Sequence, residues 1–177
     1  IIPITVSERL ITDLELTIGK EVYVEGQFRS YNNYENEKNK LILTVFAKEI
    51  RETSEEDAEA SSNEVELVGY ICKKPIYRQT PFGREIADVL LAVNRAYNKS
   101  DYIPSIAWGR NARFCKNLPT GTEVKIVGRV QSRNYEKKHE DGTVEARVAY
   151  EVSIASLQVV NEDNNENEEK AEIEEAV

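Results

Sequence analysis

An internal repeat constrains this 177-residue chain more than any other feature. Two segments, Gly19–Ser30 and Gly121–Ser132, each carry a pair of glycines seven residues apart among alternating apolar residues. An Ile-Pro dipeptide precedes each segment and an Asn-Tyr-Glu triplet follows it, at Ile2-Pro3 and Asn33–Glu35, and at Ile103-Pro104 and Asn134–Glu136. Similarity at a fixed spacing predicts two copies of one supersecondary unit.

The apolar pattern of each copy predicts β-strands. Val22, Val24 and Phe28 alternate with polar residues, as half-buried strands do, and the second copy repeats the pattern at Val124, Ile126 and Val130. Gly26 and Gly128 interrupt the two strands at matching points, which predicts a bulge or a sharp bend. A short helix is expected before each strand, over 9–16 and 110–118.

The second copy has an upstream part that the first lacks. Two further strands are expected there, over 63–72 and 85–95, joined by a turn-rich stretch that contains Thr80–Gly83. Two strands, a third strand, a short helix and two last strands form the layout of an oligonucleotide-binding (OB) barrel. We therefore expect an all-β protein with a five-stranded OB barrel at 63–160, its helix between strands three and four. A partial OB repeat, strands three to five with a helix, precedes it at 1–50.

Charge divides the chain in the same places. The net charge is −6 over 1–63, +4 over 64–160 and −7 over 161–177. Residues 51–62 are acidic and rich in Ser and Ala, which predicts a solvated linker. The last segment, 161–177, has too few apolar residues to fold alone, so a disordered acidic tail is expected. A basic module between acidic segments is typical of an anion-binding domain.

Few residues are available for catalysis or metal binding. The chain has two cysteines, Cys72 and Cys115, and one histidine, His139, so neither a zinc cluster nor a nucleophile with a His partner is expected. We predict no enzymatic activity, no metal and no cofactor. No apolar run approaches the roughly 20 residues that span a bilayer, and no leader opens the chain, so a cytoplasmic protein without membrane contact is expected.

Ordered motifs across 63–160 resemble the bacterial single-stranded DNA-binding protein family. They are Val68-Gly69, Pro75, Thr80–Gly83, Leu91–Arg95, Ile106–Arg110, Gly128–Arg133 and Tyr150–Val152. The first copy resembles the downstream half of the same family more weakly. The resemblance implies binding of single strands in replication, recombination and repair, by assemblies of four OB barrels.

The resemblance also implies the residues of a nucleic-acid site. Its base-stacking aromatics fall on Tyr97, Tyr102, Trp108 and Tyr135. Basic residues consistent with its groove are Arg110 and Arg133, with Lys73, Arg95, Lys99, Lys137 and Lys138 nearby. In the first copy, Ile1 and Ser7 stand where Tyr102 and Trp108 stand in the second, and only Tyr31 and Tyr34 remain near its loop. Periodicity alone would place Tyr102 and Trp108 inside the barrel, whereas the resemblance places them on its open face.

Two functions remain open at this stage. The first is binding and protection of single-stranded DNA without regard to sequence, and RNA is not excluded. The second is an OB interaction module of a replication or primosome complex, with weak nucleic-acid binding. The family's acidic tail recruits repair proteins through a terminal proline and aromatic residue, and this tail ends instead at Glu175-Ala176-Val177.

An isolated three-stranded sheet would expose an edge and an apolar face. Because the chain contains no methionine, we expect residues upstream of Ile1 to complete the first barrel. In the intact protein we then expect two barrels per chain and a homodimer that presents four.

Overall fold

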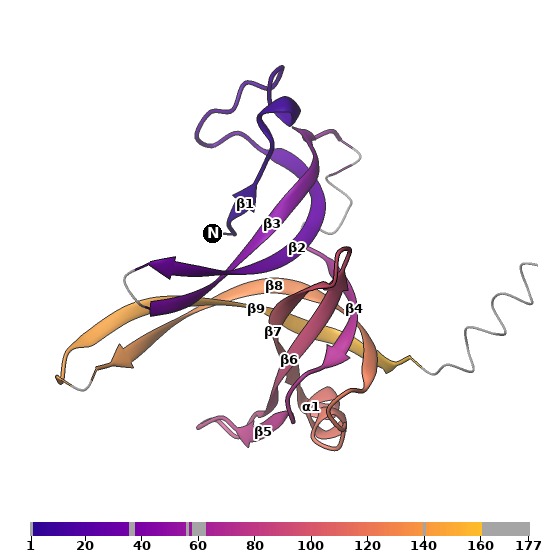
Figure 1. Cartoon of the computed structure of the whole chain (residues 1–177), viewed down its shortest axis with the longest axis vertical. Coiled ribbons are helices and arrows are strands. Elements are labelled where there is room, and N and C mark those ends of the chain that lie inside the picture. Colours follow the sequence, from indigo (N-terminus) through magenta and orange to yellow (C-terminus); the bar gives the residue numbers. More distant parts are fainter. Residues whose placement is uncertain (1, 36–37, 56, 58–62, 140, 161–177) are drawn as a thin grey trace, which may run out of the picture.

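The computed structural model describes residues 2–35, 38–55, 57, 63–139 and 141–160. Almost all of the regular structure is β, in a three-stranded and a six-stranded sheet (Figure 1). The smaller sheet holds β1 (Ile4–Thr5), β2 (Val22–Glu35) and β3 (Lys38–Glu52). The larger holds β4 (Val65–Ile71), β5 (Ile76–Gln79), β6 (Glu85–Arg95), β7 (Lys99–Trp108), β8 (Glu123–Lys138) and β9 (Val144–Val159).

The larger sheet closes into the expected barrel. Its strand order is β4-β8-β9-β7-β6-β5, and β4 also pairs with β6, which closes β4, β8, β9, β7 and β6 into one circuit. β7 and β9 pair in parallel, at Ser105 with Val152 and Ile106 with Ser153, whereas the other pairs are antiparallel. The all-β OB fold predicted from the sequence is confirmed. β5, which lies outside the closed circuit, was not predicted, because the motif around it indicated only a turn.

The barrel interior is filled by alternate residues of its strands. Fully buried side chains include Ile71, Leu91, Ile103, Ile126 and Val152. Helix α1 (Gly109–Cys115) follows β7, packs on β6 and β7, and buries Ala112 and Cys115. Burial raises the pKa of the Cys115 thiol to about 11, so this sulfur is a neutral core atom at physiological pH.

The smaller sheet repeats the register of three barrel strands. β1 and β3 pair in parallel at Ile4 with Val45, as β7 and β9 do, and β2 pairs with β3 as β8 does with β9. The register shifts at Gly26 in one hairpin and at Gly128 in the other. A Cβ at Gly26 would lie 2.3 Å from the Phe46 carbonyl oxygen, and one at Gly128 would lie 2.2 Å from that of Ser153. The predicted bulge glycines are therefore required by close backbone approach.

The helix predicted over 9–16 is absent; a 3₁₀ turn, η1 (Glu8–Leu10), and further turns take its place. Helices of this size depend on burying an apolar face. Leu10, Ile11 and Leu14 are only half-buried here and Leu16 is exposed, whereas α1 buries Ala112 and Cys115 against β6 and β7. Thr12 Oγ1 also bonds the Glu8 carbonyl, a local bond that competes with helix geometry.

The smaller sheet buries part of its apolar face against the barrel. Phe28 and Leu43 belong to the same buried cluster as the barrel core, and β2 contacts β7. β3 continues to Glu52, into the expected linker, and Arg51 Nη1 lies 2.6 Å from Asp57 Oδ2. The remainder of that linker (56 and 58–62), residue 1 and the tail (161–177) lie outside the described residues.

Candidate nucleic-acid interface

Strand β7 sorts its residues onto two faces. Ile103, Ser105 and Ala107 point into the barrel and are buried, while Tyr102 and Trp108 are 48% and 36% exposed. Because side chains alternate along a strand, the two aromatics lie on the same outer face. The expectation from the family resemblance, that these rings are on the open face, agrees with the structure, and the one from hydrophobicity does not.

Trp108 is oriented by the neighbouring strand. Its indole Nε1 donates a hydrogen bond to Ser153 Oγ at 3.1 Å. Ser153 lies on β9, beside Ile106 in the parallel pair. With its one donor satisfied, the indole keeps its aromatic surface available for a flat partner.

Tyr97 and Tyr135 are exposed at the ends of other elements. Tyr97 lies in the turn between β6 and β7, where it and Asn98 have positive φ angles of 63° and 53°, and its side chain is 93% exposed. Tyr135 lies on β8, is 37% exposed, and has the Arg133 guanidinium 5.8 Å from its ring centroid. All four predicted stacking residues are therefore accessible to solvent.

The predicted basic residues differ in their partners. Arg95 Nε lies 2.8 Å from Asp101 Oδ2, and Arg133 Nε lies 3.3 Å from Glu151 Oε2. Lys73, Lys99 and Arg110 are exposed and form no ion pair with any residue that the structure describes. Lys137 and Lys138 line a small hollow with His139 and Asp141 near the β8–β9 turn. A phosphate would thus meet unpaired charges at Lys99 and Arg110 and would compete with a carboxylate at Arg95 and Arg133.

A buried carboxylate beside Tyr102 was missed in the sequence analysis. Asp101 is 1% exposed, and its Oδ1 accepts the backbone N–H of Ser30 at 2.8 Å. Ser30 Oγ in turn accepts the backbone N–H of Tyr102 at 2.7 Å. Asp101 therefore holds Arg95 with one oxygen and strand β2 with the other. The sequence signal that could have indicated this role is the position of Asp101 directly before Tyr102, a predicted stacking residue.

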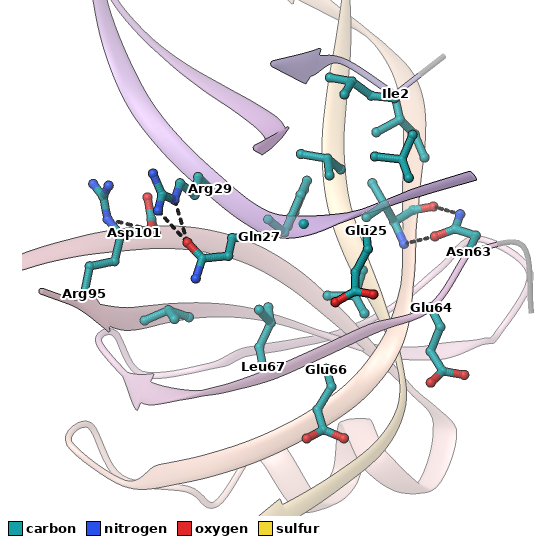
Figure 2. A pocket seen from close by; sticks show the side chains of 18 of the residues that line it. Ile2, Glu25, Gln27, Arg29, Asn63, Glu64, Glu66, Leu67, Arg95 and Asp101 are labelled. Atoms are coloured by element: carbon teal, nitrogen blue, oxygen red, sulfur yellow. Dashed lines mark hydrogen bonds and ion pairs between the residues drawn. The ribbon is translucent and has the colours of Figure 1, made fainter. Parts of the chain in front are cut away.

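A cleft of about 1130 Å³ separates β2 from β4 and the β6–β7 turn. Its lining includes Arg95, Tyr97 and Lys99, whereas Tyr102, Trp108 and Tyr135 lie elsewhere. Figure 2 shows Glu25, Glu64 and Glu66 around the same space, and the Arg95–Asp101 pair at one side. The predicted residues thus fall into a cleft group and an open-face group, which the sequence did not separate.

Near its turn, the β8–β9 hairpin carries the carboxylate of Glu145 among basic side chains. Arg147 Nη2 donates to Glu145 Oε2 at 2.8 Å, and His139 Nε2 lies 3.0 Å from the same oxygen. The hydrogen bonds from Arg147 and His139 lower the pKa of Glu145 to about 2. The carboxylate therefore stays ionised at physiological pH and offsets part of the charge of Lys137 and Lys138.

No group of three or more His, Cys, Asp or Glu side chains could hold a metal ion in the part of the chain that the structure covers. Within the same residues, none of the helices has the length and apolar character needed to cross a membrane.

Residues 62–171 match the model of the "Single-strand binding protein family". Curated relatives named single-stranded DNA-binding protein are 38% identical over 88 residues in Clostridium tetani and 40% identical over 83 residues in Staphylococcus aureus. These matches cover 46% and 43% of this chain, and 59% and 50% of the relatives. The chain therefore spans little more than half the length of the curated proteins it matches.

The fold of this chain is similar to that of solved structures. The wild-type single-stranded DNA binding protein from Thermus aquaticus matches with a TM-score of 0.66 at 23% identity, over 84% of this chain and 63% of that one. The match extends over more of the chain than the larger sheet alone.

Proposed function

Because this chain belongs to the single-strand binding protein family, we propose that it binds and protects single-stranded DNA without regard to sequence, in replication, recombination or repair. The observation that carries the proposal is the outer face of β7, where Tyr102 and Trp108 are exposed above a closed, fully buried interior. Exposed aromatics on a barrel strand give flat surfaces for bases, and every base has a flat face.

The expected energetics suit a protein that accepts any strand. Each base stacked on an aromatic ring contributes about 1–3 kcal/mol. Two or three such stacks, together with phosphate contacts at Lys99 and Arg110, are enough for micromolar or tighter binding. Because no feature of this surface selects one base edge, affinity should depend on strand length and salt more than on sequence.

Trp108 gives a direct test, since it is the only tryptophan in the chain. Titration with poly-dT should quench its fluorescence, and Trp108→Ala should weaken binding by about 1–3 kcal/mol without unfolding the barrel. Phe114→Ala is the matched control, because Phe114 is an exposed aromatic on α1 that is not one of the proposed stacking residues. Bound DNA with unchanged Trp108 emission would contradict the proposal.

Salt dependence separates this function from an interaction module. Binding of a single strand should lose about 0.7 log units of affinity per phosphate contact for each log unit of salt. A protein–protein interface would respond far less. We propose that no catalytic step accompanies binding, and the cytoplasmic location expected from the sequence remains part of the same proposal.

The tandem organisation is a further part of the proposal. We propose that residues 1–50 are a second OB-type unit, with 51–62 as linker, 63–160 as the complete OB domain and 161–177 as an acidic tail that contacts repair proteins. The shared bulge position and the shared parallel pair support a common origin of the two sheets. We also propose a homodimer that presents four OB units. Light scattering tests this, and a monomer at micromolar concentration with full DNA affinity would refute it.

A further inference from the structure

The outer face of the smaller sheet carries its own exposed aromatics. Phe46 on β3 is 40% exposed and Tyr31 on β2 is 51% exposed. Phe28 and Leu43 lie on the opposite, buried face. Gln27 stands opposite Phe46 and Arg29 stands opposite Thr44, so the exposed rings and Arg29 share one surface.

The shared register shows which residues of the two sheets correspond. Gly26 pairs with Ala47, and Gly128 pairs with Ile154. The residue before Ala47 is Phe46, and the residue before Ile154 is Ser153, the acceptor for Trp108. In the barrel, an aromatic on β7 therefore lies against a serine on β9. In the first copy, Ser7, two residues after β1, has the place of Trp108, and the aromatic residue is instead Phe46, on the neighbouring strand β3.

The guanidinium of Arg29 is placed over that ring. Arg29 Cζ lies 4.4 Å from the Phe46 ring centroid, and its only hydrogen-bond acceptor among the described residues is Gln27 Oε1 (Figure 2). In the barrel, the residue that matches Arg29 is Gln131, which donates to Glu151 Oε1 at 2.9 Å, and Arg133, two residues further along β8, is paired with the same carboxylate. The position that matches Glu151 in the smaller sheet is Thr44, so the acid that neutralises the barrel arginine has no counterpart there. Arg29 forms no ion pair with any residue that the structure describes, and it also lines the cleft that holds Glu25, Glu64 and Glu66.

We propose that this face, formed by Arg29, Tyr31 and Phe46, is a second binding surface for single-stranded DNA. A base stacks on the Phe46 ring or on the guanidinium plane that covers it, since both are flat, and a phosphate takes the remaining N–H donors of Arg29. The inference rests on the proposed function of the barrel, and it assigns DNA contact to the sheet that lacks the family's own stacking positions.

The two surfaces begin at one contact. Tyr31 follows Ser30, whose Oγ accepts the backbone N–H of Tyr102, the first aromatic of the β7 face. Because side chains alternate along β2, Tyr31 points away from Ser30, so a strand bound on the β7 face must continue past the edge of β2 to reach the second surface. The prediction is a dependence on strand length: oligonucleotides that cover one surface should not sense changes at Phe46, and longer ones should.

A reporter placed at position 46 tests the contact directly. In the full chain, Phe46→Trp combined with Trp108→Phe moves the only tryptophan to the second surface. Its emission should be quenched by poly-dT of about 35 nucleotides, a length that exceeds the roughly 4–16 nucleotides of one OB surface. Bound DNA with unchanged emission at position 46 overturns the inference.

Affinity measurements complete the test. Phe46→Ala should weaken binding of the long strand roughly 5- to 100-fold while leaving binding of a strand of about 10 nucleotides unchanged. Phe82→Ala is the control, because Phe82 is an exposed ring in the β5–β6 turn, and this variant should bind the long and the short strand as the unchanged protein does.

If Trp108 fluorescence responds to both strands but Phe46→Ala binds them as Phe82→Ala does, this inference fails and the function of the barrel stands. If Trp108 never responds, the function itself fails. A Phe46→Ala variant with altered oligomeric mass and unaltered long-strand affinity would assign the face to a protein contact and overturn the inference.

Discussion

Gly26 and Gly128 occupy the same point of two hairpins that share one register, yet the two hairpins are stabilised in different ways. The barrel hairpin closes a circuit with β4, β6 and β7, and Val124 and Ile126 before its bulge are fully buried. In the smaller sheet the matching residues, Val22 and Val24, are half-buried and line the cleft. The same hairpin geometry can thus be stabilised by a complete barrel interior, or by packing of one sheet face against a neighbouring barrel. Substitutions at matched positions should separate these two situations.

The bulge glycines should give the largest difference. Gly128→Ala forces a Cβ against the Ser153 carbonyl inside the barrel, and we expect it to lower the free energy of unfolding by about 3 kcal/mol. Gly26→Ala creates the same clash in the smaller sheet and should leave the barrel transition, followed by Trp108 fluorescence, nearly unchanged. Equal shifts in denaturant midpoint would show that both sheets unfold as one unit.

The matched valines should differ by less. Val124→Ala removes two methyl groups from a fully buried site, with an expected cost of about 2 kcal/mol. Val22→Ala is the identical change at a half-buried site, where the cost should stay below about 1 kcal/mol. Chemical denaturation of both variants measures the difference, and a Val22 effect as large as that of Val124 would mean that the cleft is closed in solution.

The matched serines should show the smallest effect and the sharpest contrast. Ser30→Ala leaves the partly buried N–H of Tyr102 without its acceptor and should cost about 1–2 kcal/mol. Ser132→Ala, at the corresponding exposed position of β8, should change stability by less than about 0.5 kcal/mol. Hydrogen exchange at the Tyr102 amide reports the local event, which should become faster only in the Ser30 variant. An unchanged exchange rate at the Tyr102 amide would show that the hydrogen bond between β2 and β7 does not link the two sheets.

Local patterns in the sequence were sufficient for the barrel and its bulges, because alternation and paired glycines act over a few residues. The positions of Tyr102 and Trp108 needed the family resemblance, since both faces of β7 carry large side chains. Whether a helix forms over 9–16 depends on whether its apolar face can pack on a core, and the spacing of apolar residues does not indicate that. The link from Ser30 through Asp101 to Arg95 joins residues about seventy positions apart, and no local pattern specifies it.

The β8–β9 hairpin extends beyond the barrel, and beyond Gln131 the β8 side chains from Ser132 to Lys138 are all exposed (Figure 1). At about 3.4 Å per residue, this arm is about 20 Å long. Tyr135, Lys137 and Lys138 lie along this arm, outside the closed circuit of strands, so the surface that the chain presents to solvent is longer than the barrel itself.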